Sequence, residues 1–392
     1  MFKPSKKLDA IPFSPIRKLF DEIARLRNEG KDVISLGIGE PDFDTPANIT
    51  EAMAKAAREG ETHYTANKGI MPLRKAIIEY LSGNYGLNYD AEEIITTVGV
   101  AEGIYIALSA YLDPGDEMLF PDPAWVNYSH VPVMNGATPI SYVLRPENNF
   151  QIDVEGLEAL VTEKTKIFVL LDPSNPIGAV QSKETLEKLA KFLVKHDLLV
   201  ISDEIYDQLL YDGVKHYSIA SFPGMFERTI VLNGFSKTYA MTGWRLGYVA
   251  APIALIPPMA KMHAYLVTNA TSMAQFGAAE ALTGPQDSVK IMVDEFQRRR
   301  DYVVKSINAI DGLSCLTPEG AFYVFVDVSG TGLTGEEFCR LMLDGGVGVV
   351  PGTAFGKSAV DFIRISYAVS MEQLEVAMGR IKKAVDDYMS QK

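Results

Sequence analysis

The strongest constraint on the fold is a regular alternation, between about residues 90 and 250, of short apolar runs with amphipathic helical stretches. Residues 167–171 are wholly apolar, which is typical of a strand that is buried on both faces. Residues 184–196 place leucines along one face at helical spacing, and residues 198–202 form a second strand-like run. Because strands joined through a helix need a crossover connection, these strands are expected to be parallel. The pattern therefore predicts an α/β fold with a mostly parallel sheet covered by helices.

The last third of the chain has a different character. A long helical period at residues 288–310 is followed by an alternating, strand-like run at residues 321–328 and by a helical stretch at residues 372–389. We expect a large domain at residues 46–284. A smaller α+β domain is expected to combine the two ends of the chain, residues 1–45 and 285–392.

Composition narrows the class of protein. Hydrophobic residues make up 47% and charged residues 22% of the chain, the balance of a globular enzyme. The net charge of -13 argues against nucleic-acid and anionic-membrane partners, because both need a basic footprint. Two cysteines are too few for a disulfide framework, and no two histidines have the spacing of a helical zinc motif. The histidine spacing leads us to expect no metal site. Because we find neither a signal peptide nor an apolar stretch of roughly 20 residues, we expect the chain to be cytoplasmic.

Polar and aromatic side chains follow four of the predicted strands. In an open parallel sheet, ligands bind beyond the carboxyl ends of the strands. An aromatic plane, an amide, a carboxylate with a phenol, and an amine should therefore converge on one crevice. These side chains are Trp125, Asn175, Asp203 with Tyr206, and Lys237.

Lys237 is the candidate nucleophile. A lysine considered alone is usually a solvated surface residue, but this one directly follows a predicted buried strand and has small and aromatic neighbours. A partly buried, polar-lined site lets an ε-amine lose its proton and act as a Schiff-base nucleophile. The context therefore favours chemistry over solvation.

Several segments resemble the class I and II aminotransferases, which are fold type I enzymes of pyridoxal 5'-phosphate (PLP). They are Gly-Glu-Pro-Asp-Phe at 39–43, Tyr-x-x-x-x-Gly-x-x-x-Leu-Arg at 64–74, Asn-Pro-Ile-Gly at 175–178, Ser-Lys at 236–237 with Met-Thr-Gly-Trp-Arg-Leu-Gly at 241–247, and Arg-Ile-Ser-Tyr at 364–367. They run in the family's order and cover nearly the whole chain. The resemblance implies PLP as cofactor, held by Lys237 as a Schiff base.

The resemblance also implies roles around the cofactor ring. Asp203 would face the pyridine nitrogen, whose protonated form drains electrons from the substrate Cα. Asn175 and Tyr206 would bond the phenolic oxygen, and Trp125 would stack on the ring. Taken alone, an aspartate at a strand end can be a turn residue, an asparagine before proline an Asx turn, and a tryptophan part of the core. Tyr128, one helical turn after Trp125, is a less favoured stacking candidate, and Glu204 is expected to point away.

The cofactor's phosphate needs donors and positive charge. Residues 97–103 lead into a helical run, so free backbone N–H groups there would face an anion. The resemblance adds a hydroxyl, a guanidinium and, from the neighbouring subunit, a phenol, which implies a homodimer with shared active sites. The candidates are Gly99, Val100, Ala101, Ser236, Arg245 and Tyr64.

Arg364 is implied to bind the substrate α-carboxylate in bidentate fashion, with Asn175 and Gly39 beside it. On an apolar strand it could instead be an exposed edge residue. The expected reaction moves the amino group of an L-amino acid to a 2-oxo acid, with Lys237 as general base and acid and with ping-pong kinetics.

Substrate choice stays open at this point. Dicarboxylate-specific relatives hold the second carboxylate with a basic residue. In one branch that residue is expected within residues 259–272, which here contain no arginine, only Lys261 and His263. In another branch it is a lysine in the phosphate loop, where this chain has Ala101-Glu102. Aspartate, aromatic residues, alanine or a broad range remain possible donors, with 2-oxoglutarate or pyruvate as acceptor. One alternative is a C–S lyase or another β- or γ-eliminating PLP enzyme. The other is a non-catalytic ligand-binding module, against which the complete catalytic set and the lack of a helix-turn-helix before residue 36 both argue.

Overall fold

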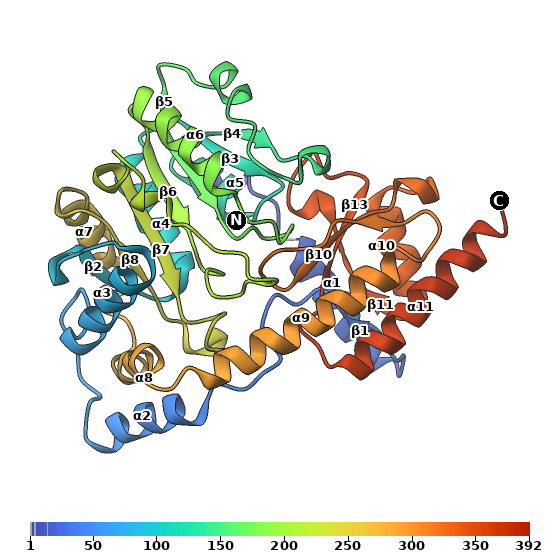
Figure 1. Cartoon of the computed structure of the whole chain (residues 1–392), viewed down its shortest axis with the longest axis horizontal. Coiled ribbons are helices and arrows are strands. Elements are labelled where there is room, and N and C mark those ends of the chain that lie inside the picture. The colour runs from blue at the N-terminus through green and yellow to red at the C-terminus, as the bar shows by residue number, and fades with distance from the viewer. Residues whose placement is uncertain (1, 4, 14) are drawn as a thin grey trace.

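A seven-stranded sheet forms the centre of the molecule, in the order β2-β8-β7-β6-β5-β3-β4 (Figure 1). The computed structural model describes residues 2–3, 5–13 and 15–392. Only β8 runs antiparallel to its neighbours in this sheet, which confirms the predicted fold class. The strands are β2 Ile94–Thr97, β3 Glu117–Asp122, β4 Thr138–Val143, β5 Thr165–Leu171, β6 Leu199–Asp203, β7 Thr229–Gly234 and β8 Gly247–Ala250.

Helices cover both faces of this sheet. Along β5, Phe168 and Leu170 pack with α6, whereas Ile167 and Val169 pack with the opposite group of helices, as the two-residue period of a strand requires. This double burial explains why the strand is apolar throughout. The helices are α2 Ala47–Arg58, α3 Met71–Tyr85, α4 Gly99–Tyr111, α5 Asn127–Met134, α6 Lys183–Lys195, α7 Ile256–Leu266 and α8 Ser272–Thr283.

A second, antiparallel sheet lies beside the first, in the order β12-β13-β10-β9. Its strands are β9 Ser314–Cys315, β10 Tyr323–Asp327, β12 Val350–Pro351 and β13 Phe362–Ser366. The helices of this part are α9 Asp287–Ile307, α10 Gly335–Asp344 and α11 Met371–Met389, and α9 extends between the two sheets (Figure 1). The large side chains of α9 and β10 share one core cluster.

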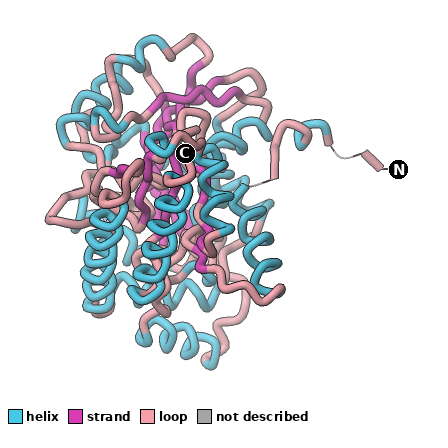
Figure 2. Tube along the Cα trace, turned by 90° about the vertical axis from the view of Figure 1, so that its right-hand side faces the viewer, coloured by secondary structure: helices cyan, strands magenta, loops and turns pink. Residues whose placement is uncertain are grey.

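The N-terminal segment is built into this second part. After α1 Pro15–Asn28, strand β1 Ile34–Ser35 pairs in parallel with β11 Val347–Gly348. Figure 2 shows the first residues extending away from the body of the molecule. The division into domains at residues 46 and 284 stays a prediction.

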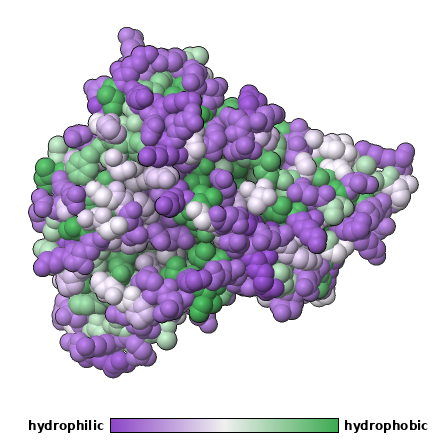
Figure 3. All heavy atoms as spheres, in the orientation of Figure 1, coloured by the Kyte–Doolittle hydropathy of each residue, from purple (hydrophilic) through white to green (hydrophobic). Residues whose placement is uncertain are grey.

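Hydrophilic side chains cover most of the face in Figure 3, and hydrophobic residues gather toward its centre, where the lobes of the two sheets meet. Among the described residues, no helix combines the length and the apolar character that a membrane span requires.

Candidate active site

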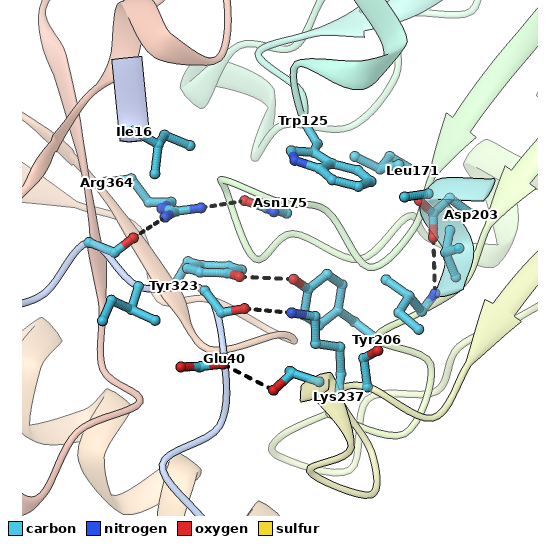
Figure 4. A pocket seen from close by; sticks show the side chains of 18 of the residues that line it. Ile16, Glu40, Trp125, Leu171, Asn175, Asp203, Tyr206, Lys237, Tyr323 and Arg364 are labelled. Carbon is cyan, nitrogen blue, oxygen red and sulfur yellow. Dashed lines mark hydrogen bonds between the residues drawn. The ribbon is translucent and has the colours of Figure 1, made fainter. Parts of the chain in front are cut away.

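A cavity of about 600 Å³ lies between the carboxyl ends of the large sheet's strands and the second sheet (Figure 4). It brings together most of the residues singled out from the sequence. Those that line it are Gly39, Val100, Ala101, Trp125, Asn175, Asp203, Tyr206, Ser236, Lys237, Arg245 and Arg364. Gly99 lies just behind the wall, against Arg245. Tyr64 lies outside the cavity, with 88% of its surface exposed.

Lys237 enters the cavity three residues after the end of β7. Its Nζ donates a hydrogen bond to the carbonyl oxygen of Gly39, at 2.5 Å. Desolvation lowers the pKa of the amine to about 8, and the charge of Arg364 contributes to the same shift. A substantial fraction of this lysine is therefore a neutral nucleophile near pH 8.

Asp203 ends β6 at the wall of the cavity and is almost fully buried (Figure 4). Burial raises its pKa to about 6, while two hydrogen bonds oppose that shift. The Tyr128 hydroxyl donates to Oδ2 at 2.7 Å, and the Ile205 N–H donates to Oδ1 at 3.2 Å. At neutral pH the carboxylate is therefore ionised and held in one orientation.

Tyr128 is not the stacking residue that the sequence offered as an alternative to Trp125. It is fully buried on α5 and is absent from the cavity wall, so it does not offer a stacking face. Trp125 lines the cavity instead. The spacing of Trp125 and Tyr128 in the sequence made both residues candidates for stacking. Nothing in the sequence shows that the Tyr128 hydroxyl reaches Asp203.

Arg364, on β13, is buried rather than at an exposed sheet edge. Its Nη1 donates to Asn175 Oδ1 at 3.0 Å, and its Nη2 donates to the Gly37 carbonyl oxygen at 2.7 Å. The guanidinium lies between two aromatic rings, 4.4 Å from the centroid of Tyr323 and 4.6 Å from that of Phe355. Its Nε is buried without a hydrogen-bond partner, an unsatisfied donor of the kind found at ligand sites.

Tyr323 is a site residue that the sequence analysis missed. Its hydroxyl lies 2.9 Å from that of Tyr206, within the cavity. A Cβ at Gly39 would lie 2.6 Å from the Tyr323 hydroxyl, so only glycine allows this close approach. The alternation of residues 321–328 predicted a strand, but not which of its side chains would face the site.

The start of α4 forms an anion cradle. The helix has no side-chain cap, so backbone N–H groups of its first turn are free to bind a negative group. Gly99 has a φ of 73°, and a Cβ there would lie 2.6 Å from Arg245 Nη2. Arg245 itself has a left-handed backbone with φ of 54°, a conformation often retained at functional sites. With the Ser236 side chain in the same wall, these donors fit a phosphate group.

Behind the cavity, Glu204 points into a buried polar cluster. Its Oε1 accepts hydrogen bonds of 2.7 Å from the hydroxyls of Ser202 and Ser218. His216 Nδ1 is hydrogen-bonded to Asp172, and its Nε2 lies 3.3 Å from Glu204 Oε2. The two carboxylates outweigh the effect of burial and raise the pKa of His216 to about 10. The cluster links the ends of β5 and β6 and supports the loops that carry Asn175 and Tyr206.

Glu102 and His263, which bear on substrate choice, are hydrogen-bonded to each other. Glu102 Oε1 lies 2.7 Å from His263 Nδ1, and His263 Nε2 lies 2.9 Å from the Asn67 carbonyl oxygen. His263 is completely buried. Over the part of the chain that the structure describes, no group of His, Cys, Asp and Glu side chains is suited to hold a metal ion.

One cavity at the edge of an α/β sheet thus combines an amine, a buried carboxylate, an anion-binding helix N-terminus and an arginine packed against two aromatic rings. This combination is typical of a group-transfer enzyme that acts on small carboxylates. Residues 31–381 match the family model described as aminotransferase class I and II, and the chain belongs to this family.

Named relatives agree with this membership. An aspartate aminotransferase of Pyrococcus abyssi is 48% identical over 97% of this chain and 98% of its own length. Aromatic-amino-acid aminotransferase 2 of Thermococcus litoralis is 44% identical over 98% of both chains. The crystal structure of an aromatic aminotransferase from Pyrococcus horikoshii superimposes with a TM-score of 0.89, at 45% identity, over 93% of this chain and 99% of that one. The chain is therefore an amino acid aminotransferase acting on amino acid and 2-oxo acid substrates, and the eliminating-lyase alternative is not favoured.

Proposed function

We propose that the cavity binds PLP and that the enzyme transfers the amino group of an L-amino acid to a 2-oxo acid by a ping-pong sequence. The observation that carries this proposal is that Lys237, Asp203 and Trp125 line one cavity together (Figure 4). When bound, PLP supplies an electron-withdrawing ring that stabilises negative charge at the substrate Cα.

Each part of the cofactor has partners in the wall. The ionised Asp203 suits the pyridine nitrogen, because a buried carboxylate favours a protonated partner. Asn175 and Tyr206 line the cavity with an amide and a phenol that would bond the ring's phenolic oxygen, and Trp125 would stack on the ring. The N-terminus of α4 (Gly99, Val100, Ala101), Ser236 and Arg245 would hold the phosphate.

Arg364 and Lys237 would act on different parts of the substrate, the α-carboxylate and the Cα proton. Arg364 lines the cavity and would bind the α-carboxylate, with Asn175 beside it and the Gly39 backbone close by. This fixes the substrate Cα near Lys237. The lowered pKa of Lys237 lets its amine take a proton from Cα and return one, as a general base and acid must.

We further propose a cytoplasmic homodimer in which Tyr64 reaches the partner subunit's phosphate site. Tyr64 and Tyr265 are exposed by 88% and 86%. Asn67 Nδ2 donates to the Thr268 carbonyl oxygen, so the loop of Tyr64 lies against the segment that follows α7 and Tyr265. Exposed aromatic side chains on neighbouring segments are typical of a protein interface.

The direct test is cofactor uptake by the apoenzyme. Wild-type protein is expected to take up PLP with a visible absorbance band and to convert it when an L-amino acid is added. Lys237→Ala should lose that band and nearly all turnover, and Lys191→Ala, which changes an exposed lysine on α6 outside the cavity, should keep both. Unchanged turnover in Lys237→Ala would contradict the proposal.

A further inference from the structure

Asp122 is a buried carboxylate to which the proposed function gives no role. It is the last residue of β3 and is 5% exposed. Its backbone stays with the large sheet, where its carbonyl oxygen accepts a hydrogen bond of 2.9 Å from the Leu144 N–H. A carboxylate that is removed from water needs donors to replace its hydration, so the source of those donors shows what the side chain holds.

The donors come from the lobe of the second sheet. The Ser358 hydroxyl donates to Asp122 Oδ1 at 2.6 Å, and the Lys357 N–H donates to Oδ2 at 3.2 Å. The Ser358 N–H adds a longer bond of 3.4 Å to Oδ1. Both donor residues belong to the loop between β12 and β13, 235 and 236 positions away along the chain. Within the part of the chain that the structure describes, each hydrogen bond to this carboxylate therefore crosses from one lobe to the other.

The loop after β3 and the loop before β13 touch at two further points. A Cβ at Gly356 would overlap Asp122 Oδ1, so only glycine lets the second loop approach the carboxylate this closely. Two residues after Asp122, the Ala124 N–H donates to the Phe355 carbonyl oxygen at 2.9 Å. The two loops thus form one continuous contact, made by a side chain at one end and by backbone groups at the other.

This contact joins two parts of the proposed active site. Trp125, which lines the cavity, comes directly after the first loop. On the other side, the ring centroid of Phe355 lies 4.6 Å from Arg364 Cζ, so the ring supports the guanidinium. Arg364 also donates to Asn175, and the contact of Asp122 adds to that tie with the large lobe. Fixing Phe355 to the loop of Trp125 therefore helps to fix how far the arginine lies from the face on which the cofactor would stack.

We propose, building on the function given above, that Asp122 is a positioning residue for substrate binding. By holding Ser358 and Phe355 against the loop of Trp125, it keeps Arg364 at the distance from the cofactor site that an α-amino acid must span. Asp122 is absent from the cavity wall, so it acts through residues that do line it. The residues proposed to bind PLP all belong to the lobe of the large sheet, so the contact should matter more to the substrate than to the cofactor.

The first test compares substrate binding with cofactor binding. The PLP-loaded wild-type enzyme is mixed with L-aspartate, L-phenylalanine or L-alanine in single-turnover experiments, and the amino acid that is converted fastest is used for the variants. Asp122→Ala should raise the concentration of this amino acid at half-maximal rate by about tenfold, because a small misplacement of a binding group is costly. The dissociation constant of PLP, from fluorescence titration of the apoenzyme, should change by less than about twofold, because Asp122 bonds none of the proposed cofactor residues.

The outcomes separate positioning from a general structural role. Equal losses for PLP and for the amino acid would show that Asp122 only stabilises the fold, and would overturn the proposal. An unchanged half-maximal concentration of the amino acid would overturn it as well, while leaving the proposed function intact. Failure of the wild-type enzyme to convert any of the three amino acids would overturn the proposed function, and this assignment with it.

Ser358 offers a milder pair of variants in case Asp122→Ala does not fold. Ser358 is exposed, so Ser358→Ala removes the shortest bond to Asp122 with little effect on packing. It should raise the half-maximal concentration of the amino acid by about threefold to fivefold, and Ser358→Thr, which keeps the hydroxyl, should restore the wild-type value. An equal loss in both Ser358 variants would overturn the proposal.

Asp153→Ala is the matched control for Asp122→Ala. The carboxylate of Asp153 also packs against a glycine and accepts a backbone N–H bond, but both come from Gly156 in its own loop. This variant should change neither the half-maximal concentration of the amino acid nor the dissociation constant of PLP. A loss of substrate binding in Asp153→Ala as large as that in Asp122→Ala would overturn the proposal, because the effect would not depend on the contact between the lobes.

Discussion

The hydroxyl of Tyr128 donates a hydrogen bond of 2.7 Å to Oδ2 of Asp203, and neither side chain is more than 3% exposed. This bond favours the ionised carboxylate, against the burial that raises its pKa. The orientation and the charge of Asp203 therefore both depend on a residue that does not line the cavity.

Tyr128→Phe is expected to weaken PLP binding by about tenfold or more, because a hydrogen bond to a charged group contributes about 1.5–3 kcal/mol. Fluorescence titration of the apoenzyme measures the dissociation constant. Tyr142→Phe is the control, since Tyr142 is equally buried but donates to the Val169 carbonyl oxygen. Equal losses in both variants would point to a general effect of buried hydroxyls, not to Asp203.

Cofactor uptake by the apoenzyme should depend on pH through Lys237. Its pKa is lowered to about 8, and only the neutral amine is a nucleophile, so the uptake rate should rise as the pH increases through that value. Stopped-flow absorbance between pH 5 and 9.5 records the rate. A profile that is flat between pH 7 and 9 would mean that Lys237 does not limit uptake.

Fluorescence titration of PLP affinity over the same pH range reports on Asp203. Its pKa is raised to about 6, so the carboxylate gains a proton as the pH falls below that value and no longer complements a protonated pyridine nitrogen. Affinity for PLP should therefore decline below about pH 6. Asp203→Asn should bind PLP weakly at every pH and remove this step.

Gly99→Ala tests the anion cradle. The substitution forces a Cβ to within 2.6 Å of Arg245 Nη2 and places alanine at a φ of 73°, so Arg245 must move away from the phosphate position. We expect the preference for PLP over pyridoxal, which lacks the phosphate, to fall by about tenfold. Gly86→Ala shares the positive φ of 69° but meets no atom within 4 Å, and it should cost about 1 kcal/mol of stability without changing that preference.

The sequence predicted those parts of the site that follow from local rules. Asn175, Asp203 and Lys237 each follow a buried strand, and parallel strands bring their carboxyl ends to one edge of the sheet. The apolar runs and helical periods were enough to establish this arrangement. Boundaries were less accurate: the helical period expected to reach residue 310 ends at Ile307, where Asn308 turns away and bonds Cys315.

Contacts between distant elements were not predictable in the same way. The Tyr128–Asp203 bond joins residues 75 positions apart, and the stacking of Tyr323 on Arg364 joins two neighbouring strands of the second sheet. Ile16 reaches the cavity only because β1 pairs with β11 and brings α1 to the second sheet. Periodicity shows that such side chains are apolar or buried, but the choice of partner depends on packing.

Mixing two inactive variants tests whether Tyr64 serves the partner subunit. If it does, a hybrid of Tyr64→Ala and Lys237→Ala subunits carries both substitutions in one site and leaves the other site intact. If Tyr64 served its own subunit, each site of the hybrid would carry one substitution. Refolding the two variants together at equal amounts should therefore restore about a quarter of wild-type activity, because half of the dimers are hybrids and each has one intact site. Each variant refolded alone is the control, and light scattering of the same samples reports whether dimers form. If the two variants form dimers together but activity is not restored, Tyr64 serves the active site of its own subunit. If the protein is monomeric and fully active, the active site is not shared between subunits.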